Sequence, residues 1–139
     1  MKVKAALQTK SSGPLTVCEV NLEEPCPDEV LVKITACGIF HTDVMMQHGS
    51  SHYPFLLGHE GSGIIEKVRK NVSDFTSGES VMISYTSCGH CPACRRKQPY
   101  HCESIYDPFF FGYREDGTTS VSYKGAPVSI LESGTRFYL

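Results

Sequence analysis

The sequence lacks the features that mark several specialised classes of protein. No apolar run approaches the roughly 20 residues that are needed to span a bilayer. The 13 Lys and Arg residues are balanced by 15 Asp and Glu residues, so the basic surface of a dedicated nucleic-acid-binding protein is missing. The start, Met1 to Lys4, lacks the apolar segment of a secretory signal. These absences predict a cytoplasmic chain that binds neither a membrane nor a nucleic acid.

The composition is that of a folded domain. The 139 residues are 40% hydrophobic and 20% charged, which is typical of a globular chain and not of a disordered one. There is also no internal repeat and no low-complexity segment. A chain of this length buries about two-thirds of its unfolded surface, which is enough for a hydrophobic core. We therefore expect one domain that spans residues 1–139.

Short β-strands dominate the predicted secondary structure. Strands are expected where Val, Ile and Leu are frequent, at residues 2–8, 15–20, 29–36, 63–68, 80–84 and 117–121. A short helix is expected at residues 42–49, with Thr42 as a candidate N-cap and Gly49 as a candidate end. Frequent Gly and Pro turns between short strands predict a mainly β fold, a barrel or a sandwich.

Cysteine is abundant, and four of the seven cysteines are crowded together. These four follow the pattern Cys88-x2-Cys91-x2-Cys94-x7-Cys102. Zn²⁺ takes four ligands in structural sites, and a C-x2-C turn presents two sulfurs to the same metal. The spacing therefore predicts a closed structural zinc site, one per chain, in a lobe at about residues 86–104.

Other readings of this cysteine cluster are an iron–sulfur centre or two disulfides. An odd number of cysteines without a secretion signal fits poorly with a disulfide framework. His90 and His101 lie next to the ligands in the sequence and are alternative donors, although four thiolates suffice. A closed site of this kind leaves no open position for catalysis.

Three motifs in this order resemble the zinc-containing medium-chain alcohol dehydrogenases. They are the cysteine cluster, Gly38-Ile39-Phe40-His41-Thr42-Asp43 and Gly58-His59-Glu60-Gly61-Ser62-Gly63. The likeness covers about residues 1–112 and corresponds to that family's N-terminal catalytic domain, whose fold is a GroES-like β-barrel. The stretch Phe109-Phe110-Phe111-Gly112 is similar to the branch that acts on aryl or benzyl alcohols.

The resemblance implies the oxidation of a small alcohol to an aldehyde or ketone, with NAD(P) as the hydride acceptor and zinc as a Lewis acid. It implies that His59 binds a catalytic zinc and that Glu60 lies close behind this metal. Asp43 would orient His59, and Thr42 would pass the alcohol proton outward. His41 would contact the pyrophosphate of the cofactor.

The sequence departs from the family pattern in three places. Phe40 stands where the family has its first catalytic cysteine, and Cys37, three residues earlier, is the alternative donor. No Gly-x-Gly-x-x-Gly motif is present, so we expect the dinucleotide-binding domain to be absent. Arg69 replaces a Gly or Ala, from which we expect a left-handed backbone strained by about 1 kcal/mol.

These observations leave three hypotheses. The first is a truncated N-terminal domain of a zinc alcohol dehydrogenase that is inactive alone and whose catalytic residues are vestigial or incomplete. The second is a non-enzymatic, zinc-stabilised barrel that acts as a binding or oligomerising module. The third is an enzyme that receives its cofactor domain from a separate chain, which Phe40 disfavours. We also expect an exposed apolar barrel face and therefore a homo-oligomer.

Overall fold

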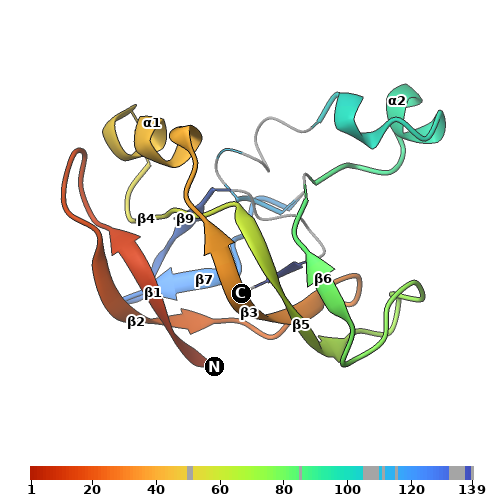
Figure 1. The fold of residues 1–139 in the computed structure, drawn as a ribbon, viewed down its shortest axis with the longest axis horizontal. Helices are drawn as coiled ribbons and strands as arrows, with labels where there is room; N and C mark the ends of the chain where they lie inside the picture. The colour runs from red at the N-terminus through yellow and green to blue at the C-terminus, as the bar shows by residue number, and fades with distance from the viewer. Residues whose placement is uncertain are drawn as a thin grey trace.

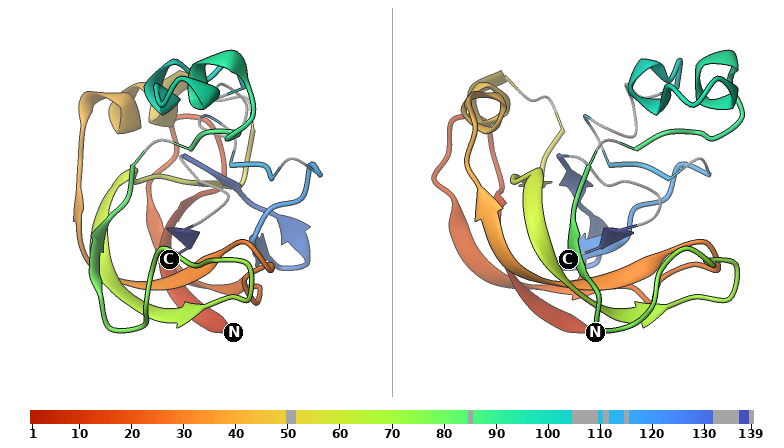
Figure 2. Two further views of the ribbon diagram at one scale, coloured as in Figure 1. Left: turned by 90° about the vertical axis from the view of Figure 1, so that its right-hand side faces the viewer. Right: turned by 45° about the vertical axis from the view of Figure 1, so that its right-hand side comes forward.

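The computed structural model describes residues 1–49, 52–84, 86–104, 110, 112–114, 116–131 and 137–138. Strands in these residues form two curved sheets that face each other as a nearly closed barrel (Figure 1). The helices lie at one end of the barrel, away from the N-terminus (Figure 2). This arrangement confirms the mainly β, barrel-like fold that was predicted from the sequence.

The larger sheet has six strands in the order β8-β7-β2-β1-β4-β9. Its members are β1 (Lys2–Gln8), β2 (Thr16–Leu22), β4 (Phe55–Leu56), β7 (Val121–Tyr123), β8 (Ala126–Pro127) and β9 (Ser129–Ile130). The antiparallel pair β1–β2 is its longest ladder and runs from Lys2 opposite Asn21 to Leu7 opposite Thr16. The strand predicted at residues 117–121 begins only at Val121, since Gly117 adopts a left-handed turn conformation with φ of +78°.

The smaller sheet has four strands in the order β10-β3-β5-β6. Its members are β3 (Val30–Gly38), β5 (Glu60–Val68), β6 (Ser80–Met82) and β10 (Phe137–Tyr138). Strands β3 and β5 pair antiparallel along their whole length, from Val30 opposite Val68 to Gly38 opposite Glu60. This pairing brings the motif at residues 38–43 and the motif at residues 58–63 to the same end of the sheet.

Two helices and one 3₁₀ turn complete the described structure: α1 (His41–Gly49), α2 (Pro92–Arg95) and η1 (Pro99–His101). Helix α1 begins at His41, so the prediction of Thr42 as the N-cap is wrong. The carboxylate of Asp43, the third helical residue, accepts a hydrogen bond from the N–H of Phe40 (2.8 Å) and stabilises the earlier start. None of the described helices has the length and apolar character that would let it cross a membrane.

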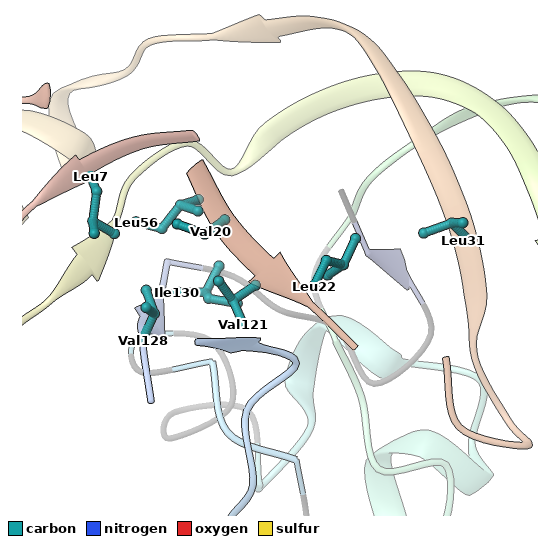
Figure 3. Packing of buried hydrophobic residues seen from close by; sticks show 8 residues of the cluster. All are labelled: Leu7, Val20, Leu22, Leu31, Leu56, Val121, Val128 and Ile130. Atoms are coloured by element: carbon teal, nitrogen blue, oxygen red, sulfur yellow. The ribbon is translucent and has the colours of Figure 1, made fainter. Parts of the chain in front are cut away.

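The hydrophobic core is divided between the two sheets. Its larger cluster lies mostly on the six-stranded sheet, with Leu31 added from β3, and consists of Leu7, Val20, Leu22, Leu31, Leu56, Val121, Val128 and Ile130 (Figure 3). A second cluster on the smaller sheet is centred on Val30, Val32 and Ile65. An apolar cavity of about 520 Å³ is lined by residues of both clusters, so the two sheets are incompletely packed against each other.

A buried ion pair joins the C-terminal third of the chain to the turn before β3. The guanidinium of Arg114 donates to both carboxylate oxygens of Glu29, at 2.8 and 3.3 Å. The side chains are only 9% and 3% exposed, and the guanidinium of Arg114 also forms an ion pair with the more exposed Glu23 (3.1 Å). No local sequence pattern predicts this contact, because the two residues are 85 positions apart.

The expectation of a left-handed backbone at Arg69 is wrong. The described non-glycine residues with positive φ are Ser12, Lys97 and Lys124. Arg69 follows β5 directly and accepts a hydrogen bond from the N–H of Val72 (3.1 Å) in the turn beyond it. The replacement of a small residue there therefore carries no penalty from a left-handed conformation.

Candidate structural metal site and the residues around His59

Four cysteine side chains converge in the lobe formed by residues 86–104. Their Sγ atoms all lie within 4.8 Å of one another, and those of Cys88 and Cys94 are 4.0 Å apart. Sulfurs placed tetrahedrally about 2.3 Å from a zinc ion are about 3.8 Å from one another. Cys91 and Cys102 are buried and the other two are half-buried. The donor set therefore fits a closed four-thiolate zinc site.

Backbone N–H groups point at the sulfurs of this site. The N–H of Cys91 donates to Sγ of Cys88 (3.3 Å), and the N–H of Cys94 donates to Sγ of Cys91 (3.5 Å). Sγ of Cys102 accepts from the N–H groups of Cys88 (3.3 Å) and Ser104 (3.4 Å). Such donors stabilise the thiolate form, which is the form that binds zinc.

The local sequence explains how the lobe folds around these sulfurs. Gly89 has φ of +77°, which lets the chain turn between the first two cysteines. Pro92 is the first residue of α2, a position where a backbone N–H would have no partner within the helix. The lack of an N–H in proline therefore costs no hydrogen bond there. The side chain of Ala93 is buried among the cysteines, and no larger apolar residue joins this cluster in the described part of the lobe. The lobe therefore has little hydrophobic core apart from its metal ligands.

The thiols of this cluster differ in acidity. The pKa of Cys91 is lowered to about 6, mainly because its sulfur accepts a hydrogen bond from the N–H of Cys94. Burial, followed by the hydrogen bond to Cys91, raises the pKa of Cys94 to about 11. Four neighbouring thiols do not all ionise together without a compensating cation. A bound divalent ion would supply that charge, so the cluster is suited to a metal more than to free thiolates.

The two neighbouring histidines have other contacts. Nδ1 of His90 donates to the carbonyl oxygen of Cys88 (2.8 Å), and the His101 ring packs against Tyr100 with 4.7 Å between ring centroids. Neither belongs to the group of converging donors. The metal site therefore consists of the four cysteines alone.

A second constellation surrounds His59, which lies in the connection between β4 and β5. Nδ1 of His59 is 3.3 Å from Oδ1 of Asp43, and both side chains are less than a tenth exposed. An ionised carboxylate only accepts hydrogen bonds, so Nδ1 carries the proton in this pair. The same oxygen accepts from the N–H of Gly58 (2.9 Å). Asp43 thus binds His59 and its neighbour to the first turn of α1.

Phe40 stands beside this pair. Its ring and the imidazole of His59 are edge to face, with centroids 6.3 Å apart and an interplanar angle of 70°. The Phe40 side chain is about half exposed, whereas His59 is buried. The phenyl ring therefore covers one side of the imidazole and offers no donor atom to a metal.

The remaining motif residues lie close to this pair in the sequence. His41 and Thr42 are the first two residues of α1, directly before Asp43. Glu60 is the first residue of β5 and pairs with Gly38. Its carboxylate lies so close over Gly38 that a Cβ there would be 2.3 Å from Oε2, which explains why this position is a glycine.

Cys37 does not supply the missing thiolate in this structure. Its thiol donates to the carbonyl oxygen of Gly38 (3.4 Å), and although the residue as a whole is exposed, partial burial of the sulfur raises its pKa, which disfavours the thiolate. Among the described residues, no group of three or more His, Cys, Asp or Glu side chains other than the cysteine cluster is arranged to hold a metal ion. The donors that the described residues gather around His59 are therefore too few for a catalytic zinc site, and no catalytic step through a metal at His59 follows from them.

Sequence comparison identifies the class of protein that this fold and these sites define. The sequence profile of the alcohol dehydrogenase GroES-like domain matches residues 26–129. An S-(hydroxymethyl)glutathione dehydrogenase of Escherichia coli O1:K1 / APEC is 35% identical over 132 residues. This alignment covers 92% of the chain and 36% of the relative. The chain therefore belongs to the alcohol dehydrogenase GroES-like domain family.

Solved structures agree with this assignment. The alcohol dehydrogenase zinc-binding domain protein from Burkholderia ambifaria is 31% identical, with a TM-score of 0.86. The benzyl alcohol dehydrogenase from Acinetobacter calcoaceticus is 30% identical, with a TM-score of 0.85. Each comparison covers 94% of this chain and 36% of the other. The chain thus corresponds to the N-terminal domain of zinc alcohol dehydrogenases and spans about a third of the length of these relatives.

Proposed function

We propose that this chain is an alcohol dehydrogenase N-terminal domain that binds one structural zinc and does not transfer hydride on its own. The cysteine cluster supports the first part, because its four sulfurs converge and its amide donors favour thiolates. Phe40 supports the second part, since it stands where the family pattern has a catalytic ligand. As the N-terminal part of a longer dehydrogenase, the chain would contribute the alcohol-facing side of the active site.

The proposed roles of the motif residues follow the family pattern. His41 would contact the pyrophosphate of NAD(P), and Thr42 would hydrogen-bond the hydroxyl of a small alcohol and relay its proton. Both stand at the start of α1, where the backbone N–H groups and the helix dipole favour a negatively charged group. Glu60 would lie at the back of the same pocket.

An activity assay tests the second part of the proposal. The purified 139-residue protein should produce no NADH or NADPH from NAD(P)⁺ with benzyl alcohol or with aliphatic alcohols. Hydride transfer requires the cofactor and a polarised alcohol to be held within reacting distance, and the residues around His59 provide no metal site for that polarisation. Turnover that co-purifies with the chain through two further separations would contradict the proposal.

A second candidate function is a non-enzymatic module that binds a partner or a second copy of itself. It is favoured by the exposed apolar side chains of Ile39, Phe40, Val44 and Met45, which lie immediately before and on α1. Sedimentation of the purified chain distinguishes this candidate. A stable oligomer without dehydrogenase activity would favour the module, and a monomer would favour the isolated enzyme domain.

A further inference from the structure

The buried Asp43 side chain makes two contacts with backbone N–H groups and one with the imidazole of His59. Its Oδ2 accepts from the N–H of Phe40 (2.8 Å), and its Oδ1 accepts from the N–H of Gly58 (2.9 Å) and lies 3.3 Å from Nδ1 of His59. These contacts connect the start of α1 with the segment that leads into β5. A carboxylate buried to this degree needs such donors, because an unpaired buried charge is strongly unfavourable.

The last turn of α1 is also held by a buried side chain. Nε2 of Gln8, at the end of β1, donates to the carbonyl oxygen of Gln47 (2.7 Å). The N–H of Ser12 donates to the same carbonyl oxygen (3.2 Å). Helix α1 is therefore fixed at both ends, and the position of Phe40 relative to His59 is set by the fold.

Three observations argue against a metal at His59. Phe40 comes from the position where the family pattern has a thiolate ligand, and its ring is in T-shaped contact with the imidazole. The thiol of Cys37 is directed to the Gly38 carbonyl. Glu60 is exposed, and its carboxylate lies over Gly38.

From these contacts we infer that His59 and Asp43 form a metal-independent structural pair in this chain, with Phe40 occupying the position of a catalytic zinc ligand. The inference deepens the proposed function, because it rests on the chain being an alcohol dehydrogenase domain with one structural metal. In this role His59 donates its Nδ1 proton to Asp43 and helps to hold α1 against the β4–β5 connection.

A cobalt titration of three proteins tests the inference. The wild-type chain should bind one equivalent of Co²⁺, with the strong visible bands of tetrahedral thiolate coordination. Phe40→Cys should bind a second, weaker equivalent and add a new thiolate band, since it places a thiol next to His59. Phe40→Ala is the matched control, because it removes the ring without adding a donor, and it should remain at one equivalent.

NMR of the His59 ring, with zinc in place of cobalt, gives a readout that does not depend on activity. In the wild-type chain the Nδ1–H signal of His59 should persist unchanged as zinc is added beyond one equivalent. In Phe40→Cys the ring signals should shift with the second equivalent. His59→Gln should lower the thermal midpoint without changing the first equivalent of bound metal.

The outcomes separate this inference from the proposed function. A second metal in the wild-type chain that is lost in His59→Gln would overturn the inference and leave the structural site intact. One equivalent in both the wild type and Phe40→Cys would show that Phe40 does not occupy a ligand position. A wild-type chain that binds no metal would instead contradict the proposed function.

Discussion

At the scale of single residues, the difference between a metal ligand and an ordinary cysteine lies in the surroundings of the sulfur. Cys91 is buried, accepts an N–H from Cys94 and lies within 4.8 Å of three other sulfurs. Cys37 is exposed and its thiol donates to the Gly38 carbonyl. Only the first environment stabilises a thiolate and presents it together with other donors.

The substitution Cys91→Ser should therefore release the bound zinc and lower the free energy of unfolding by several kcal/mol, since structural zinc contributes on the order of 10 kcal/mol to folding. The matched control, Cys37→Ser, should keep its zinc and its stability. Elemental analysis and thermal unfolding of both variants provide the check. Equal zinc content in Cys91→Ser and the wild type would contradict the assignment of the ligand.

The cysteine cluster and the residues around His59 differ in how far they can be predicted from the sequence. The spacing of the four cysteines predicted their cluster, because ligands that close in sequence can reach a common metal through a short turn. The proximity of Asp43 to His59 was expected only from the family resemblance. The hydrogen bond from the N–H of Gly58 to Asp43 could not be predicted, because it depends on how α1 meets the β4–β5 connection, whereas the bond from the N–H of Phe40 is a local capping contact.

At the scale of secondary-structure elements, the β3–β5 ladder places Gly38 opposite Glu60, the residue after His59. Its register shifts occur next to Val32 and Ile34, and Gly63 lies opposite Ile34. A Cβ at Gly63 would be 2.2 Å from the carbonyl oxygen of Lys33, which is a backbone atom that cannot rotate away. The close approach of the two strands therefore requires glycine at this position.

The substitution Gly63→Ala should destabilise the protein by about 1–3 kcal/mol or more, because the new methyl group forces the two strands apart. The matched control is Gly49→Ala at the end of α1, where a Cβ has no atom within 4 Å and should cost nothing. Chemical unfolding of both variants measures the difference. A Gly63→Ala protein as stable as Gly49→Ala would show that the ladder is looser than described.

The sequence predicted the elements themselves well and their ends less well. Residues 2–8 were predicted and observed as a strand, because short segments rich in Val, Ile and Leu favour strands. Strand β5 starts at Glu60, three residues before the prediction, because its glycines weaken the local β signal while pairing with β3 extends it. The predicted start of α1 was one residue late, because Asp43, three residues after Phe40, caps the helix from within its first turn.

At the scale of the whole molecule, the barrel and the metal lobe depend on different forces. The barrel has two clusters of buried apolar side chains, whereas the lobe has only its cysteines and Ala93. Figure 2 shows this lobe at the same end of the barrel as α1. The buried pair of Glu29 and Arg114 adds a long-range link that the sequence could not reveal. We therefore expect a metal bound by the four cysteines to stabilise the lobe more than hydrophobic packing does.

The metal content of the purified wild-type chain tests this account most directly. The cysteine cluster has all four ligands of a closed zinc site, and the residues around His59 do not form a second one. Elemental analysis against protein concentration should therefore give one zinc per chain that resists dialysis. No zinc in a folded protein of unchanged stability, or two tightly bound zinc ions per chain, would contradict the account.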